Sequence, residues 1–535
     1  MEKTTVARMI ARMCAGNGVK HAFGVPGGGS SLDLIEAFRA EGIAFHLCRT
    51  ETGAVLMAAA DAELRNGFGV AVVTQGPGAA SAMNGLAHGA LDRAPVLFIS
   101  DGWTPRQVTF DTHQVFDQRA MSGPVVKASG RLESDDPAVE LVSLVRAMFT
   151  APWGPAHIEL TGENAGREVG ARDFSRIAQE PAPAGAHGDA AGLLRGAKRP
   201  VLIVGLEARA HGVPEKLLAL AERLRCPVFP TYKAKGVLSD ESPWVIGHFT
   251  GGAAERDCIA EADLIVLCGL DPVELIGRPW PYTAPVIDIA LRRHPVHYVE
   301  PAAGCYGALS PSIDLLLDAC PDSGWAEDGL AGHKRRMRER LAYPDGGKGV
   351  SPQQVVECAM ETAGKERPAI TVDAGAHMFS AMAFWQARLP STALISNGLA
   401  TMGYALPAGI ATALNAEDRR TIVFTGDGGL LMCAGELVTA AQACRRLCII
   451  VFNDSSLSLI ALKQANRGLE SAGVGWRPVD FAGMARALGL RAWAATTRDE
   501  YVRALSEAFQ EDRPCLIDVR VDPAGYGRQA GALRG

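Results

Sequence analysis

A strand–helix–strand stretch between Thr421 and Phe452 constrains the fold of this chain more than any other feature. Thr421–Thr425 is a short β-branched apolar run, which is typical of a buried parallel strand. A glycine-rich turn follows it, and a helical pattern then runs from about Leu431 to Cys444. Leu447–Phe452 predicts a second buried strand. Because such a unit brings both strand ends to the same edge of a sheet, it predicts a ligand site there.

Polar residues follow each of these two strands. Asp427 comes directly after the first, and Asn453 ends the second, close to Ser455. A carboxylate, an amide oxygen and the Ser455 carbonyl form an oxygen-only set, which suits Mg²⁺ with phosphate oxygens as further ligands. The glycines around Asp427 let the backbone approach a diphosphate closely. A plain tight turn after a strand is the alternative interpretation.

Composition limits the class of protein. A length of 535 residues predicts about three domains. The net charge of −6 argues against nucleic acid and anionic membranes as partners, and no apolar stretch is long enough to span a membrane. The N-terminus has no signal-peptide pattern, and the 12 scattered cysteines fit a reducing compartment, so we expect a cytoplasmic protein. Cys444 and Cys448 lack a second ligand pair, so we expect no zinc site.

Alternating short strands and helices along the chain predict an α/β fold with three doubly wound parallel sheets. A Pro/Ala/Gly-rich linker spans Phe174–Pro200, and a charged link spans Asp322–Gly349, where a short basic run follows His333 as the face of a solvated helix. The tail is polar and glycine-rich, which favours a flexible lid or arm. The expected domains are residues 1–172, 185–320 and 350–521, with a C-terminal tail at 522–535.

Gly-Asp-Gly followed by an Asn at the next strand end resembles the motif of thiamine diphosphate (ThDP) enzymes. The order of the three units is similar to the pyrimidine-binding, middle and diphosphate-binding domains of the acetohydroxyacid synthase and 2-oxo acid decarboxylase branch. The resemblance covers nearly the whole chain. It implies that Asp427, Asn453 and Ser455 are ligands of Mg²⁺.

Further motifs carry the resemblance. Glu51 stands where the family has the glutamate that bonds to the aminopyrimidine ring, and Gly76 lies in a turn similar to the family's Ser-Gly-Pro-Gly, with Gln75 replacing serine. Met402 matches the apolar residue that bends the cofactor, and Ala400 stands where glycine is usual. The resemblance implies cofactor contacts at Glu51, Gly76, Gly375, Ala376, His377, Ala400, Met402, Gly426, Asp427, Gly428, Gly429, Asn453 and Ser455.

Four of these residues have ordinary alternatives. Gly76 could lie in a plain glycine turn that opens a tightly packed helix. Glu51 in a first helical turn could simply complement the helix dipole, and Met402 could be a core residue. His377 could be structural; it matches the family's Gly-Gln-His segment, in which Ala376 here replaces glutamine.

His113 and Gln114 lie where this branch places polar active-site residues, as a hybrid of the synthase and decarboxylase pairs. His113 could transfer protons near neutral pH, and Gln114 could orient substrate. A surface-loop histidine is the alternative. Gly28 and Gly29 replace larger residues of the decarboxylases, which suggests room for a bulkier or differently oriented substrate.

Two departures separate the chain from the biosynthetic synthases. Asp271 stands where they have an arginine in the middle domain, and Leu462 stands where they have a tryptophan. These changes argue against branched-chain biosynthesis and against FAD.

The resemblance implies an enzyme that uses ThDP and Mg²⁺ to cleave or form C–C bonds next to a carbonyl. Decarboxylation of a 2-oxo acid is the leading hypothesis, with release of an aldehyde or ligation to a hydroxyketone. A lyase or hydrolase that releases no CO₂, and a non-catalytic binding protein, are the alternatives; no GxSxG occurs to support a serine hydrolase. A homodimer or homotetramer with active sites at the subunit interface is expected.

Overall fold

The computed structural model describes residues 3–174, 176–177, 185–275, 277, 279–322, 324–344, 347, 349–416 and 418–534. The chain forms two compact units. Unit 1 comprises residues 1–180, 399–418 and 432–447, and unit 2 comprises residues 181–398, 419–431 and 448–535.

Unit 1 is built on a parallel six-stranded sheet. Its strands, in spatial order, are β3 (Ala44–Leu47), β2 (His21–Val25), β4 (Gly69–Val73), β5 (Val96–Asp101), β7 (Ala156–Leu160) and β6 (Ala128–Gly130). A separate antiparallel pair joins β1 (Lys3–Thr5) and β8 (Glu168–Gly170). Strands β4, β5 and β7 are buried throughout, as expected of a sheet covered on both faces.

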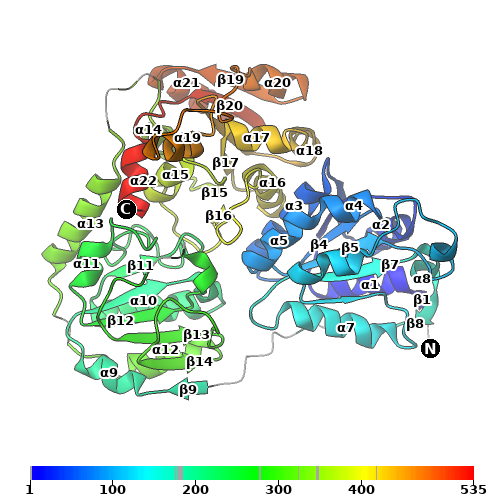
Figure 1. Ribbon diagram of the computed structural model, residues 1–535, viewed down its shortest axis with the longest axis horizontal. Helices are drawn as coiled ribbons and strands as arrows, with labels where there is room; N and C mark the ends of the chain where they lie inside the picture. Colours follow the sequence, from blue (N-terminus) through cyan, green and yellow to red (C-terminus); the bar gives the residue numbers. More distant parts are fainter. Residues whose placement is uncertain are drawn as a thin grey trace. The chain divides into compact units, whose positions relative to one another are not determined.

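Helices cover both faces of this sheet. The helical segments of unit 1 are α1 (Val6–Gly16), α2 (Ser30–Ala40), α3 (Glu51–Arg65), α4 (Pro77–Ser81), α5 (Met83–Leu91), η1 (Gln107–Thr109), α6 (Gln118–Ser122), η2 (Gly123–Val125), α7 (Pro137–Met148), α8 (Gly162–Gly166), α16 (Ala405–Asn415) and α18 (Glu436–Ala443). Figure 1 shows α3, α4 and α5 on one face and α1 and α7 on the other. Helix α3 packs against α5 and α16, and its residues from Gly53 to Glu63 are all buried.

The first sheet of unit 2 is mostly parallel. Its strands, in order, are β11 (Val228–Pro230), β10 (Pro200–Val204), β12 (Leu264–Cys268), β13 (Val286–Ala290), β14 (Ala303–Tyr306) and the antiparallel β9 (Gly185–His187). The segments around it are α9 (Ala190–Gly196), η3 (Leu206–Arg209), α10 (Val213–Leu224), α11 (Arg256–Ala260), η4 (Pro272–Glu274) and α12 (Leu309–Leu317). Successive side chains of β10 pack in different hydrophobic cores. Leu202 packs with α10 and α12, and Ile203 lies in the larger core shared with the next sheet.

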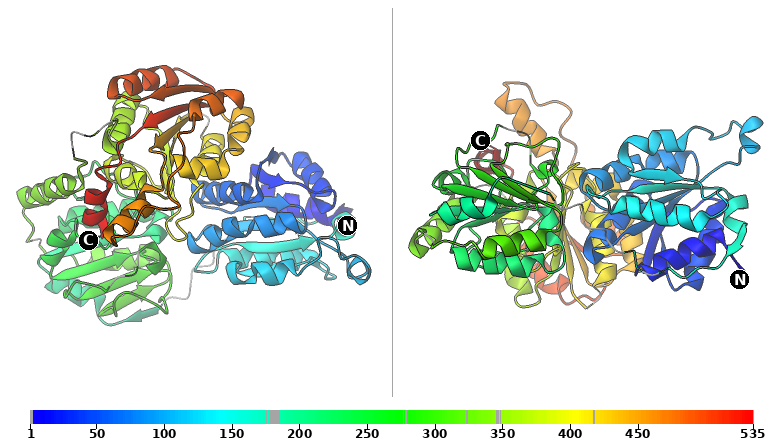
Figure 2. Two further views of the ribbon diagram at one scale, coloured as in Figure 1. Left: turned by 45° about the horizontal axis from the view of Figure 1, so that its top comes forward. Right: turned by 90° about the horizontal axis from the view of Figure 1, so that it is seen from below.

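The second sheet of unit 2 is parallel. Its strands, in order, are β16 (Ala393–Ile395), β15 (Ala369–Val372), β17 (Thr421–Gly426), β18 (Leu447–Asn453), β20 (Cys515–Arg520) and β19 (Arg491–Ala495). Its helices are α13 (Glu327–Leu341), α14 (Pro352–Ala363), α15 (His377–Phe384), α17 (Asp427–Cys433), α19 (Ser458–Asn466), α20 (Phe481–Ala487), α21 (Arg498–Ala508) and α22 (Tyr526–Arg534). Figure 2 shows this sheet in yellow to red with helices around it. The predicted α/β class with three doubly wound sheets is therefore confirmed.

Two predicted helices are each divided in the structure. The helix expected from about Leu431 to Cys444 is α17 and α18, and the first of these begins at Asp427 itself. The break comes at Gly435, where an added Cβ would lie 3.1 Å from the Arg49 Cβ. The Gly/Ala-rich stretch from Gly76 to Leu91, whose sequence pattern predicts one helix, is likewise divided into α4 and α5. Apolar periodicity continues through both breaks, so it could not reveal them.

Two segments expected to be irregular are ordered. The tail contains α22, whose Gln529 accepts from Ser380 Oγ at 3.0 Å and donates to the Leu341 carbonyl at 2.9 Å. It is therefore not a flexible arm. The charged link contains α13, where His333 and Met337 are buried, so its basic run is not simply solvated. Part of the Phe174–Pro200 linker lies outside the described residues.

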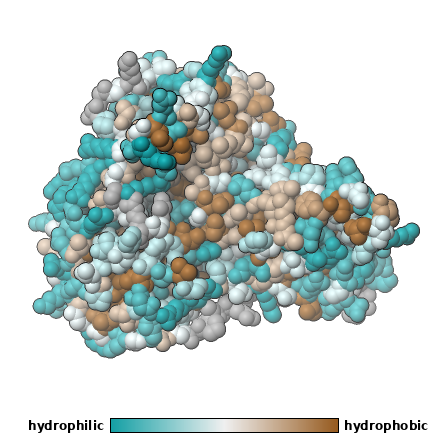
Figure 3. Space-filling model, viewed as in Figure 1, coloured by the Kyte–Doolittle hydropathy of each residue, from teal (hydrophilic) through white to brown (hydrophobic). Residues whose placement is uncertain are grey.

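None of the helices in the described ranges has the length and apolar character that crossing a membrane requires. In the space-filling view, hydrophilic side chains cover much of the visible surface, with hydrophobic ones between them (Figure 3).

Candidate functional site

Asp427 lies at the carboxyl end of β17 and is the first residue of α17. Its side chain is buried, and both oxygens accept backbone hydrogen bonds: Oδ1 from Gly428 N at 2.8 Å, and Oδ2 from Ser455 N at 2.6 Å. Burial, and then the nearby Asp454 carboxylate, raise the pKa of Asp427 to about 7. A carboxylate in this setting is poorly compensated by neutral amides and would gain from a bound cation.

Asn453 ends the neighbouring strand β18 and is held in one orientation. Its Nδ2 donates to Asp518 Oδ1 at 2.8 Å, and its Oδ1 accepts from Arg520 Nη1 at 2.9 Å. The same Arg520 nitrogen donates to Ser455 Oγ at 3.0 Å. Ser455 has a left-handed backbone (φ 59°), and its carbonyl accepts from Trp476 N at 3.1 Å while keeping a second lone pair. Asp427, Asn453 and Ser455 are thus brought together.

His377, the first residue of α15, is buried against two glycines. A Cβ at Gly375 would lie 2.7 Å from the imidazole ring, and a Cβ at Gly426 would lie 3.2 Å from it. Burial lowers the pKa of His377 to about 3, so the ring is neutral at physiological pH. Its Nε2 is buried and makes no hydrogen bond to any residue that the structure describes. Ala376 directly precedes the helix and is also buried.

Glu51 begins α3 in unit 1, and a second carboxylate fixes the backbone before it. Glu436 Oε1 accepts from the backbone nitrogens of Arg49 and Thr50, both at 3.0 Å. Thr50 caps the helix by accepting from Gly53 N at 3.0 Å. Glu436 itself is fully buried.

The turn at Gly76 lies next to the same helix start. Gly76 has a positive φ of 62°, and a Cβ there would lie 2.7 Å from the Gln114 Cβ. A Cβ at Gly78 would lie 3.5 Å from Glu51 Oε1. Gln114 and His113 are both exposed. The structure therefore brings Glu51, Gly76 and Gln114 into one neighbourhood.

The segment with Ala400 and Met402 also belongs to unit 1. Ala400 has a left-handed backbone (φ 55°), and Met402 is half-buried. The neighbouring Thr401 Oγ1 accepts from Asn84 Nδ2 at 2.9 Å on α5, and Leu399 N donates to Asp92 Oδ2 at 3.2 Å. The candidate residues thus fall into two sets, one in each unit.

A cavity of about 680 Å³ opens at the carboxyl end of the unit 1 sheet. Gly28, Gly29 and Gln114 contribute to its lining, together with the charged residues Arg106, Asp111 and Glu163. A Cβ at Gly28 would meet nothing within 4 Å, which agrees with the expected open space.

Several residues of these sets were not predicted from the sequence. They are Asp373, Glu436, Asp518 and Arg520; Asp373 Oδ2 accepts from Thr425 Oγ1 at 3.0 Å beside Gly429. The sequence feature that could have identified such residues is an acidic side chain within an apolar strand or helix, as at Asp518 in Cys515–Arg520.

Three family models match the chain. They are described as the N-terminal TPP binding domain, the central domain and the C-terminal TPP binding domain of thiamine pyrophosphate enzymes, and they match residues 4–121, 188–313 and 373–519. The chain belongs to the thiamine pyrophosphate enzyme family.

Relatives of this thiamine pyrophosphate enzyme cover nearly its full length. A Pseudomonas aeruginosa protein named "Probable 2-ketoarginine decarboxylase" is 29% identical, over 96% of this chain and 94% of the relative. The acetolactate synthase of Bacillus subtilis is 26% identical, over 97% and 94%. An acetolactate synthase of Arthrospira platensis is 29% identical, over 94% and 92%. The chain is therefore a ThDP-dependent enzyme of the acetolactate synthase and decarboxylase branch.

Proposed function

We propose that this enzyme uses ThDP and Mg²⁺ to decarboxylate a 2-oxo acid, either releasing an aldehyde or joining the product to a second carbonyl compound. The observation that carries the proposal is the oxygen set at the ends of β17 and β18. There Asp427 Oδ2 accepts from Ser455 N at 2.6 Å, next to the oriented amide of Asn453.

The residues present fit a magnesium ion. Asp427, Asn453 and the Ser455 carbonyl would be its protein ligands, an all-oxygen set of the kind Mg²⁺ prefers. Asp427 is buried with a raised pKa, and among the described residues its hydrogen bonds come from backbone N–H groups, so a dication beside it would offset the cost of its burial. Arg520, which now donates to Asn453 Oδ1, would have to share that oxygen with the ion.

The residues also fit a diphosphate. His377 offers a buried ring nitrogen that bonds to none of the residues the structure describes. A side chain at Gly375 would clash with the His377 ring, and one at Gly426 would be in tight contact with it. With Ala376, Gly428 and Gly429 they would let backbone N–H groups approach phosphate oxygens. Bound ThDP would supply the carbanion and the electron sink for the chemistry.

Unit 1 would serve the organic part of the cofactor. Glu51 would hold a proton at the aminopyrimidine ring, and Gly76 would leave room for that ring. Met402 would support the bent cofactor, and the Ala400 carbonyl would accept from its amino group. The left-handed backbone of Ala400 and the bonds of its neighbours Leu399 and Thr401 keep this segment in place.

His113 and Gln114 would act on the substrate, His113 by moving a proton and Gln114 by orientation. The cavity that Gln114 lines also holds Asp111 and Glu163, whose carboxylates could bind a cationic end of a substrate. The name of the Pseudomonas relative makes a guanidino 2-oxo acid a reasonable member of any substrate panel.

The test measures CO₂ release from aliphatic, aromatic and guanidino 2-oxo acids, with and without Mg²⁺ and ThDP, and identifies the products by mass spectrometry. Cofactor-dependent release supports the proposal, and the product separates aldehyde from hydroxyketone. Bound cofactor without release from any acid would favour a C–C lyase or hydrolase that releases no CO₂. Absence of any turnover would favour a non-catalytic binding protein.

Three further expectations belong to the proposal. The domains would be residues 1–172, 185–320 and 350–521, with the tail at 522–535 attached to the third. The enzyme would be a cytoplasmic homodimer or homotetramer. It would not need FAD.

A further inference from the structure

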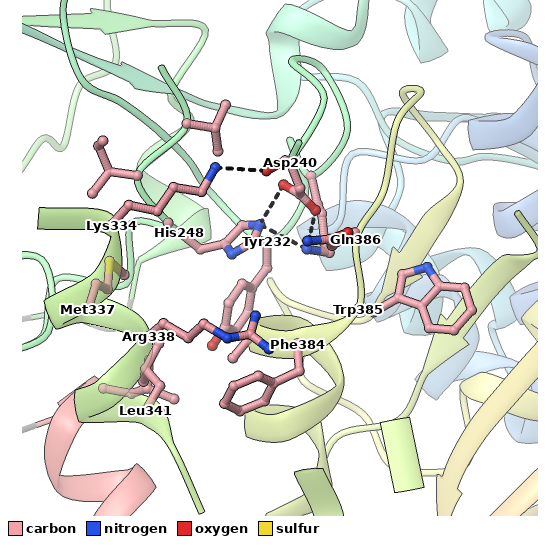
Figure 4. Close-up of a pocket in the computed structure, with 16 residues that line it drawn as sticks. Tyr232, Asp240, His248, Lys334, Met337, Arg338, Leu341, Phe384, Trp385 and Gln386 are labelled. Carbon is pink, nitrogen blue, oxygen red and sulfur yellow. Dashed lines mark hydrogen bonds and ion pairs between the residues drawn. The ribbon is translucent and has the colours of Figure 1, made fainter. Parts of the chain in front are cut away.

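A second cavity lies in unit 2, among the loop after β11, helix α13, the end of α15 and the end of α22. Its volume is about 80 Å³. Apolar side chains form much of its wall: Tyr232, Ile246, Met337, Leu341, Phe384, Trp385 and Leu533. Figure 4 shows Met337, Arg338 and Leu341 on one side, on α13, with Phe384 and Trp385 beyond them.

The charged groups around this cavity are mostly cationic. Lys235, Lys334 and Arg338 line it, whereas Asp240 is the one carboxylate among the described lining residues. Asp240 Oδ2 is already engaged, because it accepts from Lys235 Nζ at 2.5 Å and from the Ala387 backbone nitrogen at 2.8 Å. Burial, and then the adjacent Lys235 ammonium, lower the pKa of His248, so its ring adds no compensating or opposing charge at neutral pH.

Lys334 is the least compensated of these cations. Its ammonium donates to the carbonyls of Asp240 at 3.1 Å and Ser242 at 2.9 Å, which leaves a third N–H. Within the described parts of the chain it forms no ion pair with a carboxylate. Burial lowers the pKa of Lys334 even though the charges of Asp240 and Glu241 act to raise it, so desolvation outweighs these carboxylates.

Arg338 lies one helical turn after Lys334 on α13, so two like charges face the same cavity. Such pairs destabilise a helix slightly unless an anion lies between them. Arg338 uses Nη2 to bond Glu357 at 2.6 Å and rests over the Phe384 ring at 5.1 Å, which leaves other N–H groups for a ligand. Two residues of the basic run that follows His333, namely Lys334 and Arg338, therefore line a partly apolar cavity.

We propose that this cavity binds a short-chain carboxylate, with its carboxyl group between Lys334 and Arg338 and its hydrocarbon part against Phe384, Met337 and Leu341. A cavity that holds a single water has a volume of roughly 10–15 Å³, so this cavity suits a molecule of about five to eight non-hydrogen atoms. The cations select for negative charge, and the aromatic and aliphatic wall selects against a bare inorganic anion.

The test titrates the full-length holoenzyme with butyrate and with inorganic phosphate by isothermal calorimetry, without turnover, so it is independent of the proposed reaction. We expect butyrate to bind more tightly than phosphate. Lys334→Met and Arg338→Met should each weaken butyrate about tenfold or more, the value of one charge-assisted hydrogen bond. Arg335→Met is the matched control, because Arg335 is exposed on the same helix and does not line the cavity; it should bind as the wild type does.

If loss of Lys334 loosens the Asp240–Ser242 loop, the Arg338 variant still tests the proposal, because the Arg338 side chain is half exposed and its loss should disturb the packing less. Equal butyrate affinity in wild type and both variants would overturn the proposal and place any binding elsewhere, including the thiamine site. Tighter binding of phosphate than of butyrate would overturn the proposal as well. So would the absence of butyrate binding at about 10 mM, which corresponds to a binding free energy weaker than about 3 kcal/mol.

Discussion

The Asp427 carboxylate accepts a 2.6 Å hydrogen bond from the backbone nitrogen of Ser455. This bond joins the carboxyl ends of two neighbouring parallel strands, β17 and β18, at the position where the proposed ion would bind. The Ser455 amide therefore holds the Asp427 carboxylate in position. Asp518 and Arg520, both on β20, orient the Asn453 amide.

Removal of the Asp427 charge should abolish tight cofactor binding. Asp427→Asn should weaken the Mg²⁺-dependent affinity for ThDP by more than about 100-fold, since even outer residues of metal sites contribute 10- to 100-fold. Calorimetric titration with ThDP at fixed Mg²⁺ measures this. Asp328→Asn, at an exposed residue of α13, is the control; similar affinities in the two variants would contradict the ion site.

The bond between Glu436 and the start of α3 predicts a difference between two substitutions. Glu436→Ala would leave the half-buried N–H groups of Arg49 and Thr50 without this acceptor and should lower the free energy of unfolding by about 1–3 kcal/mol. Glu436→Gln keeps an acceptor and should lower the free energy of unfolding by less. Urea unfolding compares them, and equal losses would mean that these hydrogen bonds contribute little.

Adjacent glycines near the unit 1 cavity should respond differently to a methyl group. Gly27→Ala would place a Cβ 2.5 Å from Asp101 Oδ2 and 2.3 Å from Thr74 Oγ1, so we expect about 1–3 kcal/mol of destabilisation. Gly28→Ala meets open space and should fold normally. Thermal unfolding of both variants checks this, and a Gly28 variant as unstable as the Gly27 variant would argue against the open cavity. Gly28→Asp should narrow the substrate range, measured as CO₂ release across the acid panel.

Burial raises the pKa of Glu274 in unit 2 to about 7, from an ordinary value of 4.5. Its oxygens accept from Thr231 Oγ1 and from the backbone nitrogens of Leu206 and Asp271. Between these two pKa values the folded state binds more protons than the unfolded state. The stability contributed by Glu274 is therefore fully present below about pH 4.5 and is lost as the pH rises toward 7.

Glu274→Gln removes this titration, so the loss of unfolding free energy between about pH 5 and pH 8 should be smaller in the variant, by on the order of 2 kcal/mol. Urea unfolding at both pH values measures the difference. Glu215→Gln, on the exposed face of α10, should keep the wild-type dependence. An unchanged dependence in the Glu274 variant would show that this carboxyl does not titrate as described.

Local sequence was sufficient for β17 and β18, because they are β-branched apolar runs, and for the glycine-rich turn after β17, but not for the break between α17 and α18. The mutual approach of Asp427, Asn453 and Ser455 followed from parallel-sheet geometry. Arg520 and Glu436 could not be found in this way, since they reach their partners from distant segments. The order of the tail depends on Gln529 bonding to Leu341 and Ser380, contacts for which the polar composition of the tail gives no signal.

The most direct test of the account compares CO₂ release by wild-type enzyme and Glu51→Gln, both loaded with Mg²⁺ and ThDP, on any 2-oxo acid that the wild type accepts. Because Glu51 would hold the proton at the aminopyrimidine, we expect at least a 100-fold lower rate with cofactor still bound, the usual contribution of a positioned acid or base. Glu36→Gln, at an exposed residue of α2, should match the wild type. Wild-type activity in the Glu51 variant would contradict the proposed mechanism.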